Sequence, residues 1–179
     1  MKIRSDFVSN SSSSSFIIIG RDNYISNELH DRSLELPTYK GNYEFGWQFS
    51  KYDDIYSKLN FCFIILNDIY YYKDNDIPEW NSELYKKYVD KFKDYKSLFE
   101  EVCKNELHLN IKMKFGTTEC YVFIDHQSNI FEQPDNGKMF ESYDNMKDFL
   151  LSKDSCIVCG NDNTDHYPQW YLDLKENRT

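Results

Sequence analysis

A strict alternation of apolar and polar residues from Leu107 to Phe115 limits the folds open to this chain more than any other segment. Side chains alternate between the two faces of a β-strand, so this pattern is typical of a strand with one buried face. Gly116-Thr117-Thr118 supplies turn residues, and a second apolar stretch runs from Glu119 to Asp125. The two stretches and their turn predict an antiparallel hairpin in the C-terminal half of the chain.

Two long helices are predicted ahead of this hairpin. The first begins after Asp53-Asp54, since carboxylates favour a helix N-terminus, and it ends near Lys73. Its apolar residues recur at steps of three and four, the spacing of one helix face: Ile55, Leu59, Cys62, Leu66 and Ile69. The second helix begins at Asn81 or Ser82 and either continues or restarts at Ser97, which opens a capping box.

Shorter elements surround these helices. Phe16 to Ile19 is apolar throughout and predicts a strand inside a sheet, whereas the alternation from Tyr43 to Phe49 predicts a half-buried strand. Residues 21–42 show no period and are interpreted as loop. Ser142 caps a short helix, and Ser155 to Cys159 forms the last strand.

Length and element order together predict the fold class. A chain of 179 residues is most simply one domain. Helices grouped in the middle of the chain, with paired strands after them, favour an α+β fold over a parallel α/β fold. We therefore expect a single α+β domain over residues 1–179, with a mixed or antiparallel sheet and two to four packed helices.

Charge and apolar content exclude several classes of function. The net charge of -9 argues against broad nonspecific binding to nucleic acid, because neutralising phosphates requires lysine and arginine. The same charge suits binding to a basic groove on another protein. The longest apolar run, Phe61 to Leu66, falls far short of the ~20 residues of a membrane span. With five cysteines, an odd number typical of reduced thiols, the chain is interpreted as cytoplasmic.

Phe7-Val8-Ser9-Asn10 is followed by five serines and Phe16. This N-terminal signature resembles one found in many uncharacterised proteins of low-GC bacteria and their phages. Three later stretches are similar to the same group: Phe45-Gly46-Trp47 leading to Lys58-Leu59-Asn60-Phe61, then Ile124-Asp125-His126-Gln127-Ser128, and Gly160-Asn161-Asp162-Asn163. The resemblance implies a defined domain and a phage or mobile-element setting, but it brings no assigned activity.

The serine run itself has two interpretations. It is either a disordered tail or an ordered entry into the strand that starts at Phe16, and we expect order because Phe7 and Val8 place apolar groups on its other side. An ordered run could hold a phosphate through hydroxyls and backbone amides. The candidate phosphate ligands are Asn10, Ser11, Ser12 and Ser13.

Two polar loops carry candidate catalytic residues. Asp125 and His126 lie where one strand ends, and Asp162 follows the last strand with His166 close behind. If the two loops converge, their carboxylates and imidazoles could hold a divalent ion for phosphate chemistry. Ordinary turn formation explains the same residues without any activity.

Cys156 and Cys159 have the spacing of a zinc knuckle, and His166 could be a third ligand. A fourth ligand, Cys120 or His126, would have to come from the predicted hairpin. A buried strand is the competing interpretation, because Ile157-Val158 between the two thiols is apolar and β-branched.

Two classes of function therefore stay open. The first is a small acidic binding protein without a cofactor, such as a phage or mobile-element inhibitor of a nucleic-acid-handling host enzyme, whose partner is a host or phage protein. Its candidate partner contact is Tyr70-Tyr71-Tyr72, a run that places at least one tyrosine on the surface of a helix. The alternative is a metal-dependent nucleotide- or phosphate-binding protein, or a phosphohydrolase, that uses the Asp/His loops.

Overall fold

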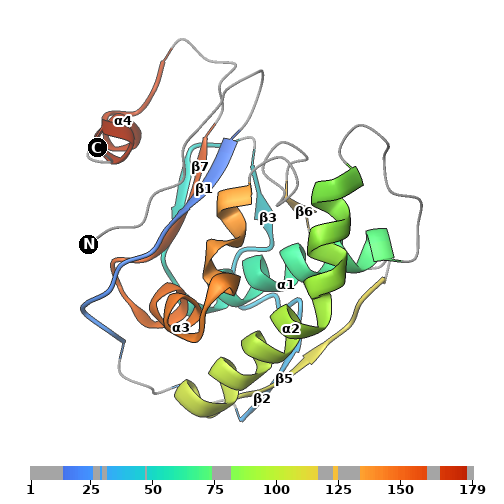
Figure 1. Cartoon of the computed structure of the whole chain (residues 1–179). Helices are drawn as coiled ribbons and strands as arrows, with labels where there is room; N and C mark the ends of the chain where they lie inside the picture. The colour runs from blue at the N-terminus through green and yellow to red at the C-terminus, as the bar shows by residue number, and fades with distance from the viewer. Residues whose placement is uncertain are drawn as a thin grey trace.

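A central strand close to the C-terminus, β7 (Cys156–Gly160), organises the main sheet of this protein (Figure 1). In the computed structural model, β7 pairs antiparallel with β1 (Ser14–Ile18) on one side and with β4 (Ser50–Tyr52) on the other. All five β7 residues are buried. The structure describes residues 14–25, 29, 32–46, 48–73, 82–116, 123–124, 134–160 and 166–176.

Helices cover one face of this sheet. The long helices α1 (Ile55–Lys73) and α2 (Ser82–Glu106) pack together, and α2 also contacts the 3-10 helix η3 (Pro134–Glu141) and α3 (Tyr143–Leu151). Ten consecutive α1 residues, Ser57 to Leu66, are buried, so α1 is the centre of the core. The predicted bounds of α1 are confirmed, with the Asp54 carboxylate accepting a hydrogen bond from the Ser57 amide at 2.9 Å. The predicted Ser142 cap of α3 is also confirmed.

A second, smaller core lies on the other face of the sheet. The C-terminal helix α4 (Gln169–Glu176) places Tyr171 there, fully buried against Phe16 and Phe49 with ring centroids 6.2 and 5.0 Å away. Gly160 allows this approach, because a Cβ at that position would lie 2.6 Å from the Tyr171 hydroxyl oxygen. The sequence analysis did not predict α4.

The described parts of the predicted hairpin have strand partners that the sequence did not predict, and residues 117–122 and 125 of the hairpin lie outside the described residues. Among the described residues, β5 (Asn110–Met113) pairs in parallel with β2 (Ser33–Leu36), and β6 (Phe123–Ile124) pairs in parallel with β3 (Glu44–Phe45). Alternation fixes which face of a strand is buried, but it does not select the partner strand. The α+β class, the single domain and the mixed pairing are confirmed.

Three further predictions need correction. Residues 21–42 are not all loop, because they contain β2. The predicted strand from Tyr43 to Phe49 is interrupted after Phe45, where Gly46 has a positive φ of 133°. β1 lies at an edge of its sheet, although Phe16 to Ile19 are buried as expected.

Of the two alternatives for α2, the structure shows a helix that continues without a restart at Ser97. No helix of the described residues has the length and apolar character needed to cross a membrane.

Among the described residues, the core contains one buried lysine. Lys58 of α1 is 1% exposed, and its ammonium donates a hydrogen bond to the Ser152 carbonyl oxygen at 2.9 Å. Burial lowers the pKa of Lys58 to about 8, because an ammonium loses hydration inside a protein. The contact links α1 to the turn between α3 and β7.

Lys58→Met should change how stability depends on pH. Between pH 8 and 10.5 the unfolded chain binds the Lys58 proton and the folded chain releases it, so this group makes the folded state more stable as pH rises. Chemical denaturation at pH 7 and pH 9 should show the wild type gaining about 1 kcal/mol relative to Lys58→Met over that interval. Other titrating groups are common to both proteins and cancel, so an unchanged difference would contradict the lowered pKa.

His108 should be a site of easy stabilisation. It lies just after α2 with a φ of 52°, and the Leu109 amide donates back to the Cys103 carbonyl at 3.0 Å at the end of the helix. Glycine adopts this conformation without the ~1–2 kcal/mol cost of a side chain. We expect His108→Gly to unfold at higher denaturant concentration than His108→Ala, with a difference of about 1 kcal/mol. Equal midpoints would show that the backbone at this position is unstrained.

Candidate functional site

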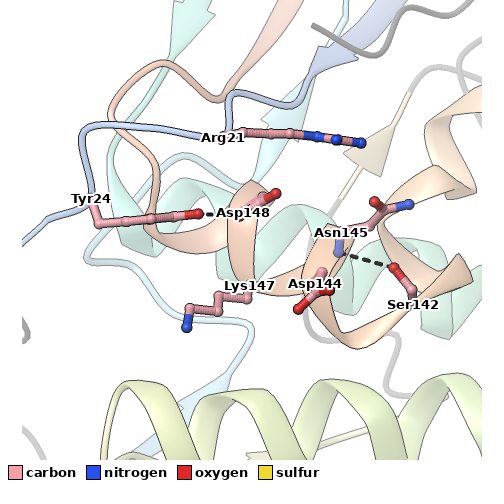
Figure 2. A pocket seen from close by; sticks show the side chains of 7 residues that line it. All are labelled: Arg21, Tyr24, Ser142, Asp144, Asn145, Lys147 and Asp148. Carbon is pink, nitrogen blue, oxygen red and sulfur yellow. Dashed lines mark hydrogen bonds between the residues drawn. The ribbon is translucent and has the colours of Figure 1, made fainter. Parts of the chain in front are cut away.

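The N-terminal half of α3 and the segment that follows β1 form a polar cleft of about 510 Å³ (Figure 2). We call it the α3 cleft. Its lining residues come from positions more than a hundred residues apart: Arg21, Tyr24, Ser142, Asp144, Asn145, Lys147 and Asp148.

Serine side chains in the turn between α3 and β7 hold the first wall of the cleft in place. The Gly20 amide donates to Ser155 Oγ at 2.8 Å, and Ser152 Oγ donates to the Asp22 carbonyl at 2.6 Å. Backbone hydrogen bonds from Ile25 to Leu151 and from Lys153 to Asn23 complete the junction. Arg21 and Tyr24 are therefore carried on a backbone that is tied to α3 at several points.

Tyr24 and Asp148 form a hydrogen-bonded pair in the cleft. The Tyr24 hydroxyl donates to Asp148 Oδ1 at 2.5 Å, and Asp148 is only 7% exposed (Figure 2). This bond raises the pKa of Tyr24 to about 12, with smaller contributions from burial and from the nearby carboxylates of Asp148, Asp22 and Asp144. Tyr24 therefore keeps its proton at neutral pH and acts as a donor.

The remaining charged groups of the cleft differ in whether they already have a hydrogen-bond or ion-pair partner. Lys147 forms an ion pair with Glu106 at 3.2 Å, and its ammonium lies 5.9 Å from the centre of the Tyr24 ring. Arg21 and Asp144 are exposed and make no hydrogen bond or ion pair with any described residue. The cleft thus presents Arg21 and Asp144 without partners among the described residues, beside the Asp148 carboxylate, of which Tyr24 occupies one oxygen.

Most predicted catalytic and phosphate-binding residues lie outside the described residues. These are Asp125, His126 and Asp162 of the two polar loops, and Asn10, Ser11, Ser12 and Ser13 of the serine run. The flanking Phe7 and Val8 lie outside them as well. Ser14 and Ser15, the last two serines, belong to β1 and face Gly160 and Cys159, so the end of the run enters the sheet as one interpretation proposed.

The predicted zinc ligands do not converge. Cys156 belongs to the small core under α4, whereas Cys159 belongs to the main core on the opposite face of the sheet. Positions three apart in a strand point to opposite faces, so both thiols cannot bind one ion. His166 is exposed, and within the described ranges no three residues of the metal-binding types are grouped to hold an ion.

The tyrosine run on α1 is only partly available for contact. Tyr70 stacks on Phe115 with centroids 5.1 Å apart, and Tyr72 meets Tyr85 edge-on at 4.6 Å. Tyr71 is 58% exposed, which confirms that the run leaves one tyrosine on the surface.

A more exposed aromatic residue, Tyr39, was missed by the sequence analysis. It is 80% exposed, and its ring meets that of Tyr43 edge-on at 5.3 Å. We call residues 38–42 the Tyr39 loop. The sequence around Tyr39 has no helical or strand period, so it did not indicate that this side chain is exposed. The contacts that hold the Tyr39 loop come from α1, further along the chain.

Buried side chains of α1 hold the Tyr39 loop. Asn60, which is fully buried, accepts a hydrogen bond from the Thr38 amide at 2.8 Å and donates to the carbonyls of Thr38 and Asn42 at 2.8 and 2.9 Å. Ser57 Oγ accepts from the Asn42 amide at 2.7 Å. Gly41 lies so close to α1 that a Cβ there would be 2.3 Å from the Ser57 nitrogen. The loop is therefore packed directly against the helix.

Asn60→Ala should be strongly destabilising. It removes three hydrogen bonds and leaves buried backbone groups of the Tyr39 loop unsatisfied, at ~1–3 kcal/mol for each such group. We expect the free energy of unfolding to fall by at least about 3 kcal/mol. Asn67→Ala is a matched control on the same helix, where one exposed bond to the Gly116 amide is lost. Similar losses in the two variants would contradict the role given to Asn60.

Comparison of the chain with protein-family models, with curated proteins and with solved structures found no match.

Proposed function

We propose that this protein is a non-catalytic binding protein that engages a basic surface of another protein through Tyr39. The observation that carries the proposal is the 80% exposure of Tyr39 on a loop fixed by buried hydrogen bonds to α1. When a partner covers a large exposed aromatic side chain, much apolar surface is removed from water, which favours binding. Tyrosine is also enriched among the residues that contribute most of the binding energy.

Rigidity of the Tyr39 loop supports this function. A side chain and loop that are already ordered lose little entropy on binding, so more of the contact energy appears as affinity. Thr38, Gly41 and Asn42 are held against α1 before any partner arrives. Tyr43 supports the Tyr39 ring from one side and leaves the other open.

The net charge favours a basic partner. With -9 overall, the protein attracts basic surfaces and accelerates its encounter with them at low salt. Nucleic-acid-handling enzymes carry such surfaces, and the N-terminal signature favours a host or phage protein among them. An inhibitor that occupies a nucleic-acid groove is therefore our preferred form of the proposal.

Tyr39→Ala should abolish most of the binding. In affinity purification from cells of the source organism, the wild type is expected to recover a basic protein in stoichiometric amount, with a yield that falls as salt is raised. Loss of a central tyrosine contact typically costs at least 2 kcal/mol, so affinity for the recovered protein should fall more than tenfold in Tyr39→Ala.

Lys86→Ala, which changes an exposed side chain on α2, is the control and should bind as the wild type does. Unchanged melting temperatures in both variants would show that folding is intact. Equal affinity of Tyr39→Ala and wild type, or recovery of no stoichiometric partner by a folded protein, would refute the proposal.

A further inference from the structure

We propose that the α3 cleft binds a small zwitterionic ligand, a molecule with an ammonium group and a carboxylate such as a free amino acid. This site is separate from the Tyr39 loop and does not depend on the function proposed for it. The inference rests on opposite charges that face one cleft without partners in the described part of the protein.

Asp148 supplies the first part of the argument. The residue is 7% exposed, and among the described residues its carboxylate accepts one hydrogen bond, at Oδ1 from Tyr24. Oδ2 has no donor among the described residues and can accept a further hydrogen bond. Because Asp148 lines the cleft, a ligand ammonium there would satisfy Oδ2.

Asp144 extends this acceptor surface. It lies one helical turn before Asp148, so the two side chains project from the same face of α3. The Asp144 carboxylate has no partner of its own in the described part of the chain. Two carboxylates at this spacing can share one ammonium group, which has three donors.

Arg21 supplies the opposite charge. In Figure 2 its side chain is extended above α3, on the wall of the cleft formed by the segment that follows β1. A guanidinium without an ion pair is suited to a bidentate contact with a carboxylate. Lys147 is less available, because it already pairs with Glu106.

The charge balance selects a zwitterion over a simple ion. Among the groups available to a ligand, Arg21 contributes +1, and Asp144 and Asp148 together contribute -2, which leaves -1. A phosphate would meet two carboxylates, and a simple cation would leave Arg21 unused. A ligand of net charge zero or +1 with both groups satisfies all three side chains. The raised pKa of Tyr24 agrees with a locally negative site.

A panel of four related compounds tests the inference. L-lysine and 6-aminohexanoate carry both groups at different separations, whereas cadaverine has only ammonium groups and hexanoate has only a carboxylate. Binding to the full chain is measured by calorimetry and by amide chemical-shift changes at residues 20–25 and 142–148. We expect at least one zwitterion to bind ten or more times tighter than cadaverine and hexanoate.

Substitutions then assign the two ends of the ligand. Arg21→Gln should remove the advantage of the zwitterion over cadaverine, and Asp144→Asn should weaken every compound that has an ammonium group. Both residues are exposed, and Arg32→Gln is a matched exposed control that should bind as the wild type does. No binding by any compound at 10 mM, equal binding of cadaverine and the zwitterions, or an unchanged preference in Arg21→Gln would each overturn the proposal.

Discussion

The antiparallel pairing of β1 with β7 is the constraint on which the rest of this structure depends. It joins Phe16 to Val158 across almost the whole chain, and residues of both strands contribute to both cores. Residues of β7 alternate between these cores, with Ile157 facing α1 and Val158 facing α4. A long loop must close for this contact, which costs entropy that only burial on both faces of the strand can offset.

The turn that leads into β7 extends this constraint to the surface. The Ser152 and Ser155 side chains form hydrogen bonds with backbone groups of residues 20–22. The Ser152 carbonyl oxygen also accepts a hydrogen bond from the ammonium of the buried Lys58. Every polar group of such a buried junction needs a hydrogen-bond partner, because each unpaired group would lower the folding stability by as much as several contacts contribute. The segment that carries Arg21 and Tyr24 is consequently tied to the core, and the α3 cleft has fixed walls.

Local signals in the sequence predicted the elements whose ends depend on neighbouring residues. The start of α1 at Asp54, the cap of α3 at Ser142 and the strand at β7 are of this kind, since each is decided within a few residues. The parallel partners of β5 and β6 were not predicted, because alternation is a local property and pairing is not. The zinc prediction failed for a related reason: spacing along the chain ignored the faces of the strand on which Cys156 and Cys159 lie.

Both candidate sites include residues from the stretch that the sequence pattern left as loop. Arg21 and Tyr24 precede β2, and Tyr39 follows it, within residues that show no helical or strand period. These segments are ordered because side chains from elsewhere in the chain, Asn60 in one case and Ser155 in the other, bind their backbone. Because these hydrogen bonds hold the backbone, the side chains of the segment do not have to pack into the core. They are therefore available for contact with other molecules. A buried polar side chain that forms hydrogen bonds to the backbone of a distant loop is therefore the structural feature by which such sites can be found when the local sequence shows no pattern.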